Sequence, residues 1–194
     1  TWGVLKGMVS VGVPIAKNIG GGGVFHRYGT YGTVVDDVAG VLKLDTYTTW
    51  RTLNPRIRFG IRYNPNTGNT RRLFIGWGPN RMVTLTSDTA PLTNSESGFL
   101  FGHGAADTQF QIFHNDGTGA CQKTTTGINL PAIATNYWLE ITTNDTTPSF
   151  TATLYTVVTG GARGSVVGSP VTISTRIPGS LVALYMQYLA VATT

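Results

Sequence analysis

The chain has 194 residues, of which 41% are hydrophobic and only 12% are charged; threonine occurs 31 times and glutamate twice. Exposed helix surfaces are normally built from Glu, Lys, Ala and Leu, whereas Thr, Val and Tyr favour sheets. This composition therefore excludes a helical bundle, a coiled coil and a doubly wound α/β fold. The 10% of aromatic residues excludes a disordered chain.

The formal net charge is +5, and seven of the ten arginines lie between Arg51 and Arg81. Such a local basic band fits nucleic acid, an anionic glycan, an acidic partner surface or simply a solvated sheet face. Cys121 is the single cysteine, so an intrachain disulfide and a thiol-based metal site are excluded.

Residues 1–23 are predicted to form an apolar N-terminal arm that ends in a hinge of four glycines, Gly20 to Gly23. Such an arm can dock on a neighbouring subunit; the alternative is that it is the first strand of the main sheet. The segment has no cleavage-site pattern, so no signal peptide is expected, and no apolar run reaches the ~18 residues of a membrane span. The predicted assembly contacts are Trp2, Val4, Leu5, Val11 and Ile15.

Residues 56–63 show the clearest strand alternation, with arginines on one side and apolar residues on the other. The turn-forming residues 64–69 predict that the chain reverses into a second strand over 71–77. This hairpin would join two rows of arginines into one basic face that suits an anion, a carboxylate partner or water. Its members are Arg56, Arg58, Arg62, Arg71 and Arg72.

Further strands are predicted at about ten-residue spacing, over 82–86, 98–103, 109–114, 137–142, 150–158, 171–175 and 181–191. The strands 137–142 and 150–158 are expected to pair as a hairpin. The last strand is apolar on both faces, which predicts a central position in its sheet. Residues 24–194 are thus predicted to form one antiparallel β-sandwich without convincing helix.

Motifs for chemistry are scarce. His103 and His114 are expected to bond to the backbone; the alternative is a metal site that they form with Asp116. No nucleophile elbow and no phosphate-binding loop occur. The pairs 115–116 and 144–145 are predicted to form Asx turns at hairpin ends, so neither Ca²⁺ nor any other metal or cofactor is expected.

The order of strands and turns from Gly29 onward resembles the concanavalin A-like lectin/glucanase (laminin G-like) jelly roll, in particular its copies in tailed-phage and virion structural proteins. The resemblance rests on YGTVVDDVAGVLKLDT, RIRFGIRYNPNTGNTRRLFIGWG, GFLFGH, FQIFHNDGTG, NYWLEITTNDTTPSFTATLYTV and SLVALYMQYLAVATT. It covers most of the chain but includes no catalytic signature, and the family is functionally mixed.

Glycosidases of that superfamily carry paired acids on one strand, because one carboxyl group protonates the leaving oxygen while the other attacks. Here Glu96 and Glu140 stand apart and no E-x-D pair occurs, so no enzymatic activity is expected. Sugar binding stays open, since it needs an exposed aromatic ring beside amides or carboxylates. The candidate ligand-binding residues are Trp50, Trp77, His114, Asn115 and Asp116, although each Trp could instead belong to the core.

The first functional hypothesis is a non-enzymatic virion structural protein: a capsid decoration, head-fibre or tail-associated jelly roll. It would be located in an extracellular particle and assemble with other copies of itself and with other virion proteins. The alternative is a carbohydrate-binding module or lectin, which is compatible with the first because a virion fibre can bind a surface glycan. A third is an icosahedral capsid subunit, but Lys6 and Lys17 are the only basic residues of the arm, so nucleic-acid binding is not expected.

Overall fold

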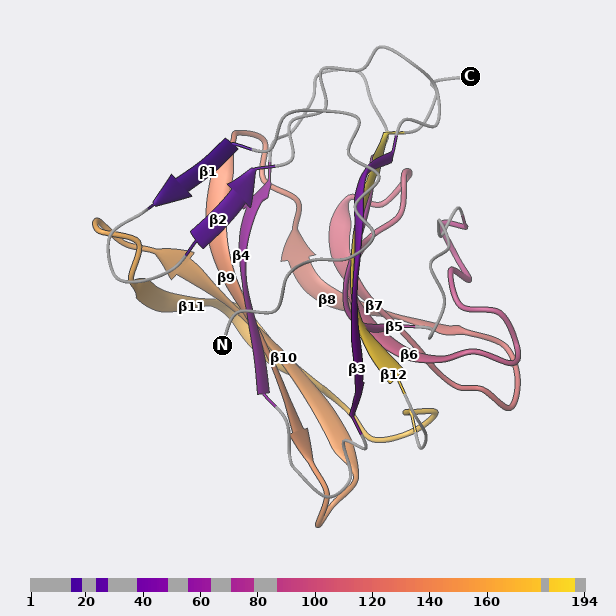
Figure 1. Ribbon diagram of the computed structural model, residues 1–194. Helices are drawn as coiled ribbons and strands as arrows, with labels where there is room; N and C mark the ends of the chain where they lie inside the picture. Colours follow the sequence, from indigo (N-terminus) through magenta and orange to yellow (C-terminus); the bar gives the residue numbers. More distant parts are fainter. Residues whose placement is uncertain are drawn as a thin grey trace.

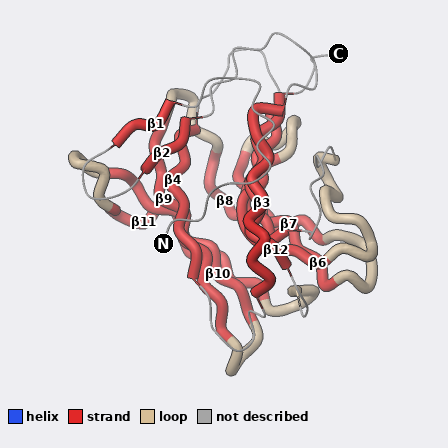
Figure 2. The backbone as a smooth tube through the Cα atoms, viewed as in Figure 1, coloured by secondary structure: helices blue, strands red, loops and turns tan. Residues whose placement is uncertain are grey.

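The computed structural model describes residues 15–18, 24–27, 38–48, 56–63, 71–78, 87–178 and 182–190. Every regular element in these ranges is a strand, and none is a helix (Figure 2). The all-β class predicted from composition is therefore confirmed. In chain order the strands are β1 (Ile15–Asn18), β2 (Val24–Arg27), β3 (Val38–Thr48), β4 (Arg56–Tyr63), β5 (Arg71–Gly78), β6 (Ser97–His103), β7 (Gln109–Asp116), β8 (Gln122–Asn129), β9 (Thr135–Asn144), β10 (Ser149–Val157), β11 (Arg163–Ile173) and β12 (Val182–Ala190).

Two large antiparallel sheets face each other as a sandwich (Figure 1). The four-stranded sheet has the order β11-β10-β9-β4, and the six-stranded sheet has the order β3-β12-β5-β6-β7-β8. β1 and β2 form a separate two-stranded sheet, with β2 next to β4. β12 lies between β3 and β5, which confirms the central position predicted for the apolar C-terminal strand. The predicted β9–β10 hairpin is also confirmed.

The hydrophobic core lies between the two large sheets and is rich in aromatic rings. Phe99 on β6 stacks on Phe150 of β10 across the sandwich, with ring centroids 4.8 Å apart. Phe101 and Phe110 stack within the six-stranded sheet at 5.0 Å. Each of these side chains is essentially inaccessible to water, and burial of one such ring contributes about 1.5–3 kcal/mol. The core therefore joins the two sheets into one unit.

β9 shows how alternation in the sequence becomes an inner and an outer face. Tyr137, Leu139 and Ile141 belong to the core cluster between the sheets. Trp138 and Glu140 occupy the intervening positions, so they lie on the opposite face of the four-stranded sheet. The outer face of this sheet consequently carries polar and aromatic side chains.

A second apolar cluster covers the outer face of the six-stranded sheet. Phe74, Leu100 and Phe113 from β5, β6 and β7 pack there with Leu92, which belongs to the segment between β5 and β6. Because of this cover, β6 and β7 are buried on both faces. That explains the apolar run Phe99-Leu100-Phe101 in β6, whereas β7 also buries the polar Gln111, His114 and Asn115.

The predicted hairpin between residues 56–63 and 71–77 is wrong. β4 pairs with β9 at the edge of the four-stranded sheet, whereas β5 pairs with β12 and β6 inside the other sheet. The physical reason is burial: residues 73–78 of β5 are all buried, while Arg58 of β4 is exposed. A strand that is apolar on both faces gains more in the interior of the six-stranded sheet than beside an arginine-bearing edge.

Two edge strands, β8 and β11, differ from the sequence prediction, and β2 and β3 were not among the predicted strand ranges either. β8 was not predicted, and β11 begins eight residues earlier than the predicted strand 171–175. Both are edge strands with mostly exposed or half-exposed residues, so they lack an apolar pattern. β11 also contains Pro170, Gly168 with φ +68° and two register shifts, features that are tolerated at a sheet edge but lower the strand signal.

The remaining predictions fall partly outside the described residues. The strand predicted over 82–86 lies outside them, as do Trp2, Val4, Leu5 and Val11 of the predicted arm. Ile15 lies in β1, which pairs with β2 across the connection that contains the four glycines. The alternative that this segment is the first strand of the main sheet is therefore wrong for residues 15–18. Docking of the arm on another subunit stays a prediction.

Candidate functional site

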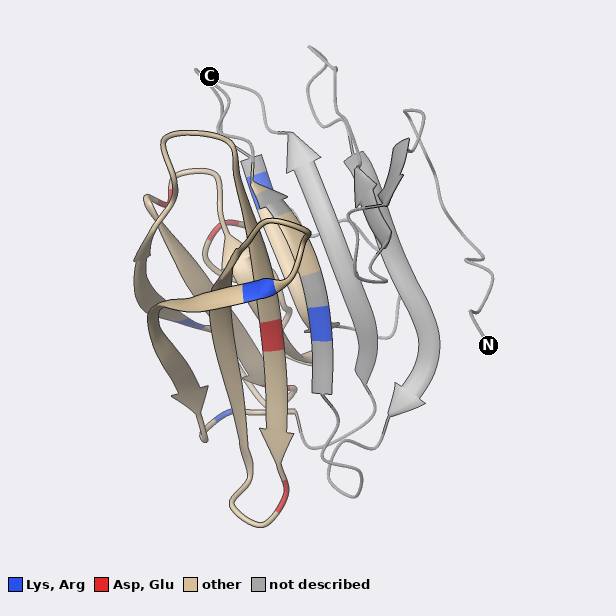
Figure 3. Cartoon of the chain, turned by 90° about the vertical axis from the view of Figure 1, so that its left-hand side faces the viewer, with Lys and Arg blue, Asp and Glu red and all other residues tan. Residues whose placement is uncertain are grey.

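The outer face of the four-stranded sheet gathers aromatic and charged side chains from all four of its strands. The strand register places Arg58, Glu140 and Thr153 opposite one another on β4, β9 and β10. The next row on the same face places Trp138 opposite Tyr155. In Figure 3, a red band on β9 lies between blue bands on β11 and β4, on the face turned to the viewer. We call this surface the outer-face cluster: Arg58, Trp138, Glu140, Tyr155 and Arg163.

Glu140 is shared by two arginines. The Nε of Arg58 donates to Oε2 of Glu140 at 2.5 Å, and Nη1 of Arg163 lies 3.4 Å from the same oxygen and 3.5 Å from Oε1. The Glu140 side chain is only 10% exposed, whereas the arginine side chains are 53% and 47% exposed. One largely buried carboxylate thus holds two guanidinium groups in place at the surface, and the three groups together carry a formal charge of +1.

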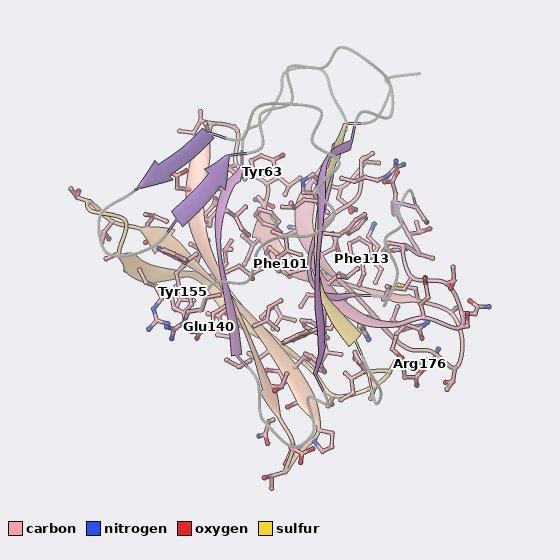
Figure 4. The ribbon with its side chains drawn as sticks, in the orientation of Figure 1. Tyr63, Phe101, Phe113, Glu140, Tyr155 and Arg176 are labelled. Atoms are coloured by element: carbon pink, nitrogen blue, oxygen red, sulfur yellow. The ribbon has the colours of Figure 1, made fainter. Side chains whose placement is uncertain are left out.

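The aromatic residues of the cluster are fixed by polar contacts. The Arg163 guanidinium lies over the Tyr155 ring, 4.4 Å from its centroid, which is a cation–π contact. The indole Nε1 of Trp138 donates to the Gly161 carbonyl at 2.9 Å. Both aromatic side chains are half-buried. Figure 4 shows Tyr155 and Glu140 on the side of the four-stranded sheet that faces away from the other sheet.

Apolar surface continues beside the aromatic pair. Val166 of β11 lies opposite Tyr155 in register and is 45% exposed. At the other end of the row, Gly60 of β4 lies opposite Trp138 and adds no side chain next to the indole. The row therefore offers a flat, partly apolar strip bordered by fixed charges, a combination suited to a ligand with both apolar and polar faces.

The sequence did not single out this cluster, although the signal was present. The alternation of residues 137–142 places Trp138 and Glu140 on one face, opposite the apolar Tyr137 and Leu139. What no local pattern indicated is the approach of Arg163, which lies at the start of β11 and reaches Glu140 across β10, the strand between β11 and β9.

The predicted sugar-binding residues do not form an exposed site. Trp77 is 4% exposed and belongs to the core, which confirms for this residue the alternative that the Trp side chains are part of the core. His114 and Asn115 are buried as well, because β7 is covered on both faces. Trp50 lies outside the described residues.

His114, Asn115 and Asp116 instead anchor the loop that follows β11. His114 Nδ1 contacts the Arg176 carbonyl at 3.2 Å, and Arg176 Nη2 donates to Asn115 Oδ1 at 3.2 Å. Asp116 forms an Asx turn with the Thr118 backbone N–H, which confirms the predicted turn role. The bonds from the Thr118 N–H and hydroxyl hold the pKa of Asp116 below its ordinary value.

The predicted basic face is divided between the two sheets. Arg58 lies on β4, and Arg56 and Arg62 occupy positions of the same strand parity. Arg71 and Arg72 belong to β5 in the other sheet, so the five arginines do not share one face. Arg72 Nε donates to Asp88 Oδ1 at 2.6 Å, which gives it a structural role.

The buried histidines make the backbone contacts that were predicted. His103 Nδ1 lies 3.0 Å from the Gly104 carbonyl, and its ring contacts Tyr63 and Phe110 edge-on. Within the described part of the chain, its buried Nε2 has no hydrogen-bond partner. Burial lowers the pKa of His103, against the opposing effects of the Gly104 carbonyl and nearby carboxylates. Burial also lowers the pKa of His114.

Among the described residues there is no group of three or more His, Cys, Asp or Glu side chains placed to hold a metal ion. A search of the same residues for a helix long and apolar enough to cross a membrane finds none.

By its fold, the protein is a two-sheet antiparallel β-sandwich. No family model and no curated protein matches the chain. Among solved structures it is similar to the carbohydrate recognition domain of Emp46p in its potassium-bound form, with 10% sequence identity, a TM-score of 0.49, and coverage of 79% of this chain and 71% of that chain. A similarity of this size neither assigns the chain to a family nor transfers a function to it.

Proposed function

We propose that this protein is a non-enzymatic carbohydrate-binding domain and that the outer-face cluster is its binding site. The observation that carries the proposal is the pairing of Trp138 with Tyr155 on an outer sheet face, directly beside charges fixed on Glu140. A sugar ring has apolar C–H faces that stack on aromatic rings, and hydroxyl groups that need charged or planar hydrogen-bonding partners. The cluster supplies both within two neighbouring rows of one sheet.

Fixed geometry supports binding at this face. Trp138 is held by its bond to Gly161, and Arg163 is held both by Glu140 and by the Tyr155 ring. Side chains that are ordered before the ligand arrives lose little conformational entropy on binding. The face can therefore bind a ligand through a small contact area.

The non-enzymatic part of the proposal is supported by the state of the carboxylates. A general acid must hold its proton near neutral pH, which requires a raised pKa. Asp88 shows the opposite: burial acts to raise its pKa, but the bonds from Arg72 and the Ala105 N–H outweigh this effect and keep the pKa below its ordinary value. Asp107 and Glu140 lie in ion pairs with Lys123 and Arg58, so each has a structural partner.

The test is a panel of immobilised glycans followed by calorimetric titration of each hit. Trp138→Ala and Tyr155→Ala are each expected to weaken binding of a hit about two- to ten-fold, because an aromatic stacking contact contributes about 0.5–1.5 kcal/mol beyond the buried area itself. The matched control is Ile133→Ala, which removes a 74% exposed apolar side chain in the β8–β9 loop. No glycan hit, or hits that survive both substitutions, would refute the proposal.

A virion structural role is compatible with a glycan-binding face and stays a prediction, as does location in an extracellular particle. That role is favoured by the scarcity of acids, the Thr-rich and sparsely charged composition and the hinged arm, of which the structure describes only Ile15–Asn18.

A further inference from the structure

The outer-face cluster carries a net positive charge, and this favours ligands with an acidic group over neutral ligands. Arg58 and Arg163 share the single carboxylate of Glu140. Arg56 and Arg62, at positions of the same parity on β4, lie opposite Thr142 and Asn136 in register, so β9 brings no acid to those positions. Glu140 is the only acidic residue in β4, β9, β10 and β11. The sheet that carries the cluster is therefore strongly basic.

The two guanidinium groups keep donors available for a ligand. Each guanidinium has five N–H donors in a planar fork that matches a carboxylate or a sulfate. Arg58 gives its Nε donor to Glu140, and Arg163 gives its Nη1 donor. Among the described residues no other acceptor takes a bond from either group, and about half of each side chain is exposed.

Building on the proposed function, we infer that the outer-face cluster selects acidic saccharides, with the sugar ring on the Trp138–Tyr155 strip and its carboxylate or sulfate on the guanidinium groups of Arg58 and Arg163. Glu140 acts as a positioning residue, because its carboxylate is largely buried and orients both arginines. A neutral sugar would form no charge-assisted hydrogen bond with the guanidinium groups of Arg58 and Arg163, so it should bind this face more weakly than an acidic sugar.

A single-stranded nucleic acid also combines phosphates with rings that stack, but it fits this face less well. Such ligands follow a basic groove over several nucleotides. Here Glu140 lies between the two arginines, so the basic surface of the cluster is not continuous over several nucleotides. A saccharide needs to place only one acidic group beside one ring.

The experiment compares matched ligands that differ only in charge, by calorimetric titration at constant ionic strength. The probes are a galacturonic acid oligomer against its methyl ester, and a sulfated oligosaccharide against its desulfated form. At least one acidic probe is expected to bind ten-fold or more tightly than its neutral counterpart, since a charge-assisted hydrogen bond contributes about 1.5–3 kcal/mol, or about ten-fold or more. Arg58→Gln and Arg163→Gln should each reduce that preference about ten-fold.

Lys123→Gln is the control for overall charge. It removes one positive charge from β8 in the other sheet, where Lys123 pairs with Asp107, and should leave the preference unchanged. Arg163→Lys keeps the positive charge but loses the planar guanidinium donors, so its preference for acidic probes should lie between those of the wild type and Arg163→Gln. Far-ultraviolet circular dichroism checks that each variant retains its sheet structure.

The outcomes separate this inference from the proposed function. Equal binding of acidic and neutral probes, with sensitivity to Trp138→Ala retained, would overturn the acidic selectivity and leave carbohydrate binding standing. Failure to bind any saccharide would overturn both. Tighter binding of a single-stranded oligonucleotide than of either acidic probe, lost in Arg163→Gln, would assign the face to nucleic acid instead.

Discussion

Acidification from pH 7.5 to pH 5.5 is expected to destabilise the fold, and His103→Phe should reduce this effect. Burial lowers the pKa of His103 and of His114 below the ordinary 6.5. The unfolded chain therefore binds more protons than the folded chain once the pH falls below 6.5. The stability contributed by the neutral, buried rings is complete above that pH and is lost as the pH decreases towards the folded pKa values.

The size of the effect follows from the number of protons. Each histidine that stays neutral in the folded state contributes a slope of at most about 1.4 kcal/mol per pH unit below the unfolded pKa. With both histidines the slope is at most about 2.7 kcal/mol per unit, an upper limit that is large against a total stability of about 5–15 kcal/mol. His103→Phe retains an aromatic ring beside Tyr63 and Phe110, and it should reduce the slope because one of the two buried histidines is removed.

Urea unfolding followed by tryptophan fluorescence at pH 7.5, 6.5 and 5.5 measures these slopes. The variant also loses the contact with the Gly104 carbonyl, so its stability at pH 7.5 will differ and the slope is the informative quantity. Asp88 and Asp116 have lowered pKa values, so their contributions are lost only at more acidic pH and do not interfere. A native stability that is constant over this range, or an equal slope in the variant, would contradict the reasoning.

Two further substitutions test the packing of the six-stranded sheet and its loops. Gly102→Ala on β6 would place a Cβ atom 1.6 Å from the Leu73 carbonyl oxygen of β5, so the two strands must separate. We expect the free energy of unfolding, measured with urea, to fall by about 3 kcal/mol or more. A decrease below about 1 kcal/mol would show that the two strands are not as close as described. Arg176→Ala removes the hydrogen bonds to Asn115 Oδ1 and to the Ala120 carbonyl, and it leaves the oxygen of the fully buried Asn115 amide without that donor. The same urea experiment should show a free energy of unfolding that is lower by about 1–3 kcal/mol. Unchanged stability would show that water replaces the arginine.

Several elements were predictable because their signals are local. The alternation in residues 56–63 and 137–142 predicted β4 and β9, and the Asn144-Asp145 turn predicted the β9–β10 hairpin, in which Asn144 Oδ1 accepts from the Thr147 N–H. The apolar C-terminal strand was correctly predicted to be central. In each case the signal lies within the segment itself: a strand with one apolar side alternates, and a strand that is apolar on both sides is expected inside a sheet.

The sequence did not predict the edge strand β8, and it did not predict correctly which strands pair with β4 and β5. β8 reads as QKTTTGIN because an exposed edge strand needs no apolar side, so its backbone pairing leaves little trace in the residue types. The turn-rich residues 64–69 predicted a hairpin between β4 and β5. Burial of β5 on both faces, which depends on Leu92 and the segment around it, placed that strand in the other sheet.

The amino-acid sequence by itself determined the all-β class, the face on which Trp138 and Glu140 lie and the scarcity of acids, because composition and strand parity are local properties. Only the tertiary structure decided that Arg58 and Arg163, which are 82 and 23 residues away from Glu140 in the chain, meet at its carboxylate. The physical reason is that strand pairing depends on which apolar faces can be buried together across the whole chain. No single segment contains that information.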